Sequence, residues 1–86
     1  MELQDFNPKL IYIPLLDEGL PVVRPTQGEP QTDGSFVVLP TADYDSEDEA
    51  WEFPPGSRVR CVEEVRGAEC ILVARELVVL PRYLAQ

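Results

Sequence analysis

Short stretches rich in Val, Ile and Leu, separated by turn-forming residues, make up most of the chain. Nine Pro and five Gly interrupt these stretches at the spacing typical of an all-β fold, and apolar positions at helical spacing are scarce. The pattern predicts strands at residues 10–15, 20–27, 35–39, 57–66 and 69–78. Short antiparallel strands bury one face each by closing on themselves, so we expect a small, partly open SH3-like barrel, with an OB-like Greek-key barrel as the alternative.

Proline and glycine positions predict where these strands bend or end. Pro14 cannot donate a ladder hydrogen bond, so the end of the first strand is expected at an edge or a bulge. Pro21 and Pro25 are expected to interrupt the second strand, because proline removes a donor and restricts φ. A polar turn is expected at residues 28–34, where an Asp-Gly pair favours a positive φ.

A hairpin around Gly67-Ala68 is the strongest local prediction. A short turn at this point places apolar side chains on one face of the hairpin: Val59, Cys61, Val65, Cys70, Leu72 and Ala74. The other face is expected to be a salt-bridged surface, because many of its residues are charged: Arg58, Arg60, Glu64, Arg66, Glu69 and Arg75.

The two cysteines share the apolar face of this hairpin without lying opposite each other. The register pairs Cys61 with Ala74 and Cys70 with Val65, which separates the cysteines by more than the roughly 7 Å between Cα atoms that a disulfide allows. We therefore expect two reduced thiols that fill the core. Zinc is not expected, because no further Cys and no His is available as a ligand.

Length and composition limit the class of protein. The 86 residues form one domain, and the 44% hydrophobic content is too high for a disordered chain. The longest apolar runs are far shorter than the roughly 20 residues that span a bilayer. The N-terminal sequence MELQDFNPK has neither the basic region nor the apolar core of a signal peptide. We expect a cytoplasmic protein without membrane contact, as a monomer or weak homodimer.

The most charged segment reads DYDSEDEAWE, at residues 43–52. It holds six of the sixteen acidic residues and no Lys or Arg, in a chain of net charge −9. Like charges at this density repel one another, so the segment must face water or a positive partner. We expect a flexible acidic loop at about residues 41–50. Trp51 and Phe53 at its end are expected either in the core or on a binding surface.

Several kinds of chemistry are disfavoured by composition. The absence of His removes the commonest general base and metal ligand, so we expect no enzyme and no cofactor. The acidic segment does not fit an EF-hand, because Asp48 and Pro54 stand where Gly and Glu are needed. Nucleic acid is not an expected partner, since phosphate binding requires clustered Lys and Arg.

These observations favour a non-catalytic protein-interaction module whose acidic surface contacts a basic protein. The candidate binding residues are Asp43, Tyr44, Asp45, Glu47, Asp48, Glu49, Trp51, Arg24, Arg58 and Arg60. The three arginines are expected to adjoin the acidic loop. The alternative is a domain that binds a small ligand or a divalent metal, with the barrel mouth as the pocket and Tyr44, Trp51 and carboxylates as its lining.

Two segments resemble a group of small bacterial proteins without an established activity. Residues 12–25 match the pattern Y-x-P-L-L-D-E-G-x-x-V-x-R-P, and residues 51–61 match W-E-F-P-P-G-x-x-V-R-C. The resemblance implies a bacterial cytosolic β-domain and adds no catalytic residues. Val23 stands where an aromatic residue is frequent in the group, which weakens any stacking role for that strand.

Overall fold

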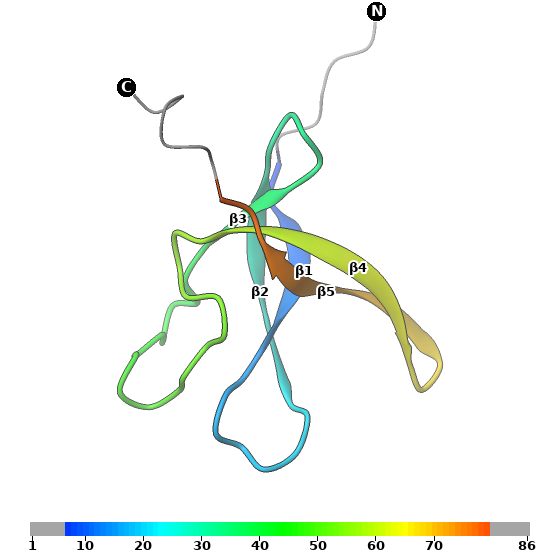
Figure 1. Cartoon of the computed structure of the whole chain (residues 1–86). Helices are drawn as coiled ribbons and strands as arrows, with labels where there is room; N and C mark the ends of the chain where they lie inside the picture. Colours follow the sequence, from blue (N-terminus) through cyan, green and yellow to red (C-terminus); the bar gives the residue numbers. More distant parts are fainter. Residues whose placement is uncertain (1–6, 80–86) are drawn as a thin grey trace, which may run out of the picture.

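The computed structural model describes residues 7–79, which form a closed barrel without a helix (Figure 1). Its strands are β1 (Lys9–Pro14), β2 (Val23–Pro30), β3 (Phe36–Val38), β4 (Arg58–Arg66) and β5 (Glu69–Leu77). The prediction of an all-β fold built as a small five-stranded barrel is confirmed.

The barrel is a sequential meander in which each strand pairs with its neighbours along the chain. Consecutive strands are antiparallel, and the ring closes where β5 runs parallel to β1 at Tyr12 and Val73. The ring is therefore closed, whereas the sequence predicted a partly open one. The order of the described strands contains no Greek-key crossover, which favours the SH3-like arrangement over the OB-like alternative.

β2 begins and ends three residues later than predicted and runs through Pro25 without a break. The Leu15 N–H donates to the Val22 carbonyl at 2.9 Å, so these two residues form a hydrogen-bonded pair. In an antiparallel ladder every second pair of opposite residues is hydrogen-bonded, and the pairs between them are not. Pro25 lies opposite Tyr12 in one of the intervening pairs and removes no hydrogen bond to β1. The predicted interruption at Pro25 is therefore wrong, while Pro21 lies in the loop before the strand.

Gly28 lies in β2, not in the polar turn that the sequence predicted there. The residue is buried, and a Cβ at this position would lie 2.7 Å from the Ile11 Cδ1 atom and 3.0 Å from the Phe36 Cβ atom. The missing side chain thus allows β1, β2 and β3 to pack closely. The turn itself is shorter than predicted, and Gly34 adopts its positive φ of 87°.

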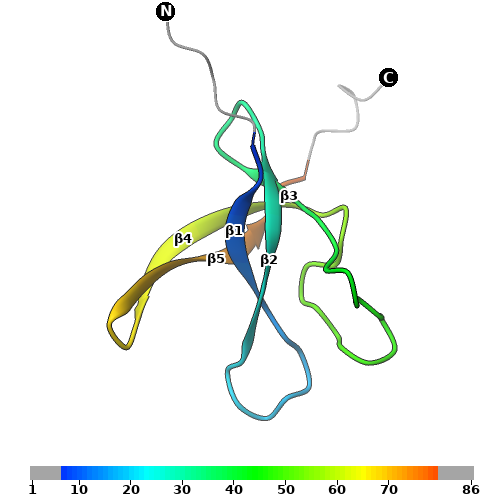
Figure 2. The same cartoon turned by 180° about the vertical axis from the view of Figure 1, so that it is seen from behind.

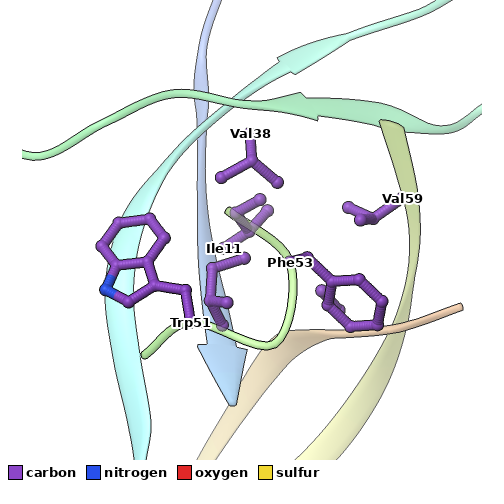
Figure 3. Close-up of a cluster of buried hydrophobic side chains, with 7 residues drawn as sticks. Ile11, Val38, Trp51, Phe53 and Val59 are labelled. Atoms are coloured by element: carbon purple, nitrogen blue, oxygen red, sulfur yellow. The ribbon is translucent and has the colours of Figure 1, made fainter. Parts of the chain in front are cut away.

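The core lies inside the barrel and includes both aromatic residues that end the acidic segment (Figure 3). Its buried members are Ile11, Ile13, Val38, Trp51, Phe53, Val59 and Ala74. Trp51 is 5% exposed and Phe53 is 7% exposed. The structure therefore decides between the two expectations for these rings, and both belong to the core.

The predicted register of the β4–β5 hairpin is confirmed from Cys61 and its partner Ala74 to the turn. A β-bulge between Arg60 and Cys61 shifts the register by one residue beyond that point. The predicted salt-bridged face is also present. The Glu64 carboxylate accepts hydrogen bonds from Arg75 Nε at 2.6 Å and Nη2 at 2.8 Å, and it lies 3.4 Å from Arg66 Nη2.

The outer part of this hairpin, residues 62–71, projects from the barrel as an arm, while Cys61 and Leu72 still pack against the core (Figures 1 and 2). The expectation that its apolar face is core is wrong at the tip, where Val65 is 76% exposed and Cys70 is also exposed. The reason is geometric. Among the described strands, β3 pairs with β4 only at Arg58 and Val59, at the start of β4. The arm therefore extends beyond β3, which leaves its tip without a covering strand.

Candidate functional site

The acidic segment lies in the long connection between β3 and β4, residues 39–57, which we call the acidic connection. It lies beside the β1–β2 loop, residues 15–22, at one end of the barrel (Figures 1 and 2). The Leu16 N–H donates to the Ala50 carbonyl at 2.7 Å, and the Glu52 N–H donates to the Pro14 carbonyl at 2.9 Å. Together with the bridge between Leu15 and Trp51, these bonds attach the acidic connection to the end of β1.

One ion pair and one ring contact hold the acidic connection against the barrel. Arg24 of β2 forms a two-point ion pair with Glu49, and its Nε lies 3.1 Å from the Glu49 Oε1 atom. The same oxygen accepts a hydrogen bond from Trp51 Nε1 at 3.1 Å. The Tyr44 ring meets the Trp51 ring edge-on, with centroids 4.7 Å apart. We call these residues, Arg24, Tyr44, Glu49 and Trp51, the anchor cluster.

The anchor cluster shifts the pKa of both ionic partners in the direction that favours their charged forms. The hydrogen bond from Arg24, followed by that from Trp51, lowers the pKa of Glu49. The hydrogen bond to Glu49 raises the pKa of Arg24, and the charges of Asp43 and Glu18 act in the same direction. Because Arg24 is 45% exposed and Glu49 24% exposed, we expect this pair to contribute at most about 1 kcal/mol.

The other candidate carboxylates, on Asp43, Asp45, Glu47 and Asp48, are exposed. Their backbone is organised by turns: the Asp45 carbonyl accepts hydrogen bonds from the N–H groups of Asp48 at 3.0 Å and Glu49 at 3.1 Å. The Asp45 carboxylate also accepts the Glu47 N–H at 2.8 Å. None of the ion pairs between described residues involves these carboxylates.

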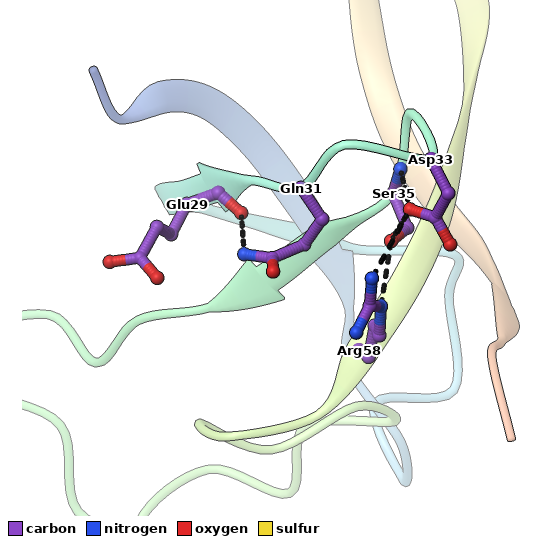
Figure 4. Close-up of polar contacts among 5 residues, drawn as sticks. All are labelled: Glu29, Gln31, Asp33, Ser35 and Arg58. Carbon is purple, nitrogen blue, oxygen red and sulfur yellow. Dashed lines mark hydrogen bonds and ion pairs between the residues drawn. The ribbon is translucent and has the colours of Figure 1, made fainter. Parts of the chain in front are cut away.

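Arg58 and Arg60 pair with carboxylates outside the acidic segment, and their part in the candidate site stays a prediction. Arg58 Nε donates to the Ser35 hydroxyl at 3.0 Å, and its Nη2 lies 3.4 Å from Asp33 Oδ1 (Figure 4). Arg60 Nε lies 3.6 Å from Glu76 Oε1. Both arginines belong to β4, and their partners lie in the β2–β3 turn and in β5, which proximity in the sequence does not reveal.

Sequence reasoning missed an apolar contribution from the neighbouring β1–β2 loop. Leu16 is 46% exposed, Leu20 is 74% exposed and Val22 is 39% exposed. The pattern predicts Leu20 and Val22 inside the second strand, on the same face of it. The proline between them was the available signal that this stretch is a loop.

The β1–β2 loop and the acidic connection lie together at one end of the barrel, joined by the Leu16–Ala50 hydrogen bond. Arg24 interacts with Glu18 of the β1–β2 loop and with Asp43 and Glu49 of the acidic connection. The end of the barrel thus presents exposed carboxylates beside exposed aliphatic side chains. We call this the loop-end surface, comprising Leu16, Leu20, Val22, Asp43, Asp45, Glu47 and Asp48.

The described part of the chain contains no detected pocket and no group of three or more His, Cys, Asp or Glu residues that could hold a metal ion. The alternative of a small-ligand or metal-binding domain therefore stays a prediction. Residues 7–79 also contain no helix with the length and apolar character needed to cross a membrane. The chemistry that the loop-end surface does offer is binding of positive charge.

Comparison with protein-family models, curated proteins and solved structures finds no match for this chain. The resemblance of residues 12–25 and 51–61 to small bacterial proteins therefore stays a prediction.

Proposed function

We propose that the protein is a non-catalytic interaction module whose acidic connection binds a basic protein. One observation carries this proposal: exposed carboxylates project from a connection whose end is packed into the core through Trp51. An anchored loop loses less conformational freedom on binding than a free one, so more of its interaction energy remains as affinity. Arg24 neutralises Glu49 and leaves the other carboxylates of the loop-end surface available.

Charge supports the same proposal at longer range. A chain of net charge −9 attracts basic proteins and repels nucleic acids and anionic membranes. Opposite charges on two surfaces raise the rate of encounter and favour the correct orientation. We further propose that the protein works in the cytoplasm as a monomer or weak homodimer, where its two free thiols stay reduced.

The test compares two variants that lose the same charge at different places. The loop-neutral variant carries Asp43→Asn, Asp45→Asn, Glu47→Gln and Asp48→Asn. The control variant carries Glu29→Gln, Glu63→Gln, Glu69→Gln and Glu76→Gln, all of which are exposed positions outside the loop-end surface. Glu49 is kept in both because it holds the acidic connection to Arg24.

Immobilised wild-type and variant proteins are used to capture proteins from an extract of the source cells at physiological salt. We expect wild type and the control variant to retain the same basic protein, and the loop-neutral variant to lose it. Equal retention by both variants would show that net charge alone, and not the acidic connection, attracts basic proteins. That result would overturn the proposed function.

A further inference from the structure

The loop-end surface combines acidic and aliphatic side chains, and the proposed function uses only the acidic ones. The acidic connection supplies carboxylates, whereas the β1–β2 loop supplies Leu16, Leu20 and Val22. Isolated exposed aliphatic residues are common on proteins and need no explanation. Here they are grouped in one short loop next to a concentration of negative charge, and such grouping is typical of contact surfaces.

The β1–β2 loop is held at its base, so its aliphatic side chains are presented from a defined backbone. The Leu15 N–H donates to the Val22 carbonyl at 2.9 Å, which closes the loop. The Leu16 N–H donates across to the Ala50 carbonyl at 2.7 Å, which joins the loop to the acidic connection. One partner that contacts the carboxylates can therefore contact the aliphatic side chains at the same time.

Charge complementarity decides which occupant fits this surface. The β1–β2 loop carries the carboxylates of Asp17 and Glu18 itself, and the acidic connection is bonded to the same loop at Leu16. A second copy of the chain would bring the same negative charge against them. A cationic segment of another protein attracts them instead.

We infer that the loop-end surface binds a cationic amphipathic protein segment, one that carries both Lys or Arg and large aliphatic side chains. This inference rests on the proposed function and adds apolar contacts to it. In such a complex the carboxylates neutralise the basic side chains, and Leu16, Leu20 and Val22 lose their contact with water. Burial of two or three aliphatic side chains raises affinity by at least about tenfold over charge alone.

The experiment uses two fluorescent synthetic peptides with equal numbers of lysines, one built from Leu and Lys and the other from Ser and Lys. Binding is measured by fluorescence anisotropy at physiological salt. The variant is Leu16→Ser with Leu20→Ser, at positions 46% and 74% exposed. The matched control is Val62→Ser with Val65→Ser on the arm, at positions 50% and 76% exposed. Circular dichroism verifies that both variants are folded.

We expect wild type to bind the Leu/Lys peptide at least about tenfold more tightly than the Ser/Lys peptide. The Leu16/Leu20 variant should lose this preference and keep its affinity for the Ser/Lys peptide, while the Val62/Val65 variant should behave as wild type. A preference that survives in the Leu16/Leu20 variant, or that is lost in the Val62/Val65 variant, would overturn the inference.

Other outcomes separate this inference from the proposed function. If wild type binds both peptides equally and the loop-neutral variant binds them more weakly, the inference of apolar contacts is overturned and the proposed acidic binding stands. Binding of neither peptide would overturn both. Sedimentation equilibrium without peptide tests a second copy as occupant: a wild-type dimer that the Leu16/Leu20 variant abolishes would also overturn the inference.

Discussion

At the scale of single residues, Trp51 connects the core to the acidic connection. Its ring is nearly buried, yet its indole N–H donates to Glu49 at the surface, and the ring forms a T-shaped contact with Tyr44. Trp51 therefore stabilises the fold in two separable ways, by apolar packing and by one hydrogen bond to a charged acceptor. A smaller aromatic ring at this position keeps part of the packing and loses the hydrogen bond.

Trp51→Ala is expected to lower the free energy of unfolding by about 3–5 kcal/mol, because a large buried ring leaves a cavity. Trp51→Phe should cost less, since it keeps most of the apolar contacts and loses the bond to Glu49. Urea unfolding followed by circular dichroism measures both. A cost below about 1 kcal/mol for Trp51→Ala, a value typical of surface sites, would contradict the buried position.

Gly28 is a second residue whose effect depends on its neighbours in the barrel. Gly28→Ala is expected to destabilise the protein by about 1–3 kcal/mol, because the new methyl group overlaps Ile11 and approaches Phe36. The adjacent and exposed Glu29→Ala serves as the control and should change stability little. An unchanged or raised stability of Gly28→Ala in urea unfolding would show that the strands can separate without cost.

At the scale of elements, the turn between β2 and β3 is held by a compact polar cluster. Asp33 Oδ1 accepts hydrogen bonds from the Ser35 N–H at 2.9 Å and from the Ser35 hydroxyl, and Arg58 of β4 lies beside both (Figure 4). The hydrogen bonds from Ser35, with a smaller effect of Arg58, lower the pKa of Asp33 from 3.8 to about 2. The turn is thereby joined to β4 as well as to its own strands.

This pKa predicts an acid dependence of stability. A carboxyl group with a lower pKa in the folded state binds protons more readily when unfolded, so its stabilisation is present above pH 3.8 and is lost as the pH falls towards about 2. Asp33→Asn should remove this component and make the fall in melting temperature between these pH values shallower. Glu29→Gln should retain the wild-type slope, and an Asp33→Asn profile parallel to wild type would contradict the assignment.

The different exposure of the two cysteines of the β4–β5 hairpin predicts different reactivity of their thiols. Cys70 is exposed, whereas Cys61 is half-buried and its burial raises its pKa to about 11. Because the thiolate is the reactive form, a thiol reagent should modify Cys70 first in the folded protein and Cys61 much more slowly. Both should react in denaturant without reductant. Cys61→Ser and Cys70→Ser identify the two phases, and the reverse order would contradict the exposed position of Cys70.

At the scale of the whole molecule, uneven charge is the main electrostatic feature. The loop-neutral variant should be as stable as wild type or more stable at low salt, because it relieves repulsion within the acidic connection. Wild type should gain stability as the Debye length falls from about 30 Å at 0.01 M salt to about 8 Å at 0.15 M, and the loop-neutral variant should gain less than the control variant. Loss of stability in the loop-neutral variant would mean that these carboxylates hold the fold together.

Local patterns were sufficient for most of the strands because the hydrogen-bond partners there are close along the chain. The β4–β5 register follows from one turn and strict alternation, and it holds until the bulge at Arg60. The pattern predicts β2 too early because Leu20 and Val22 have strand-forming side chains, and only pairing with β1 reveals that the ladder begins at Val23.

The sequence by itself determined an all-β chain, a concentration of acid at residues 43–52 and the absence of a basic residue within it. Tertiary structure alone decided that Trp51 is buried, that Arg24 pairs with Glu49, and that Arg58 turns to Asp33 instead. The physical reason is range. Alternation and like-charge repulsion act between neighbours in the chain, whereas barrel closure brings together residues from distant strands and loops.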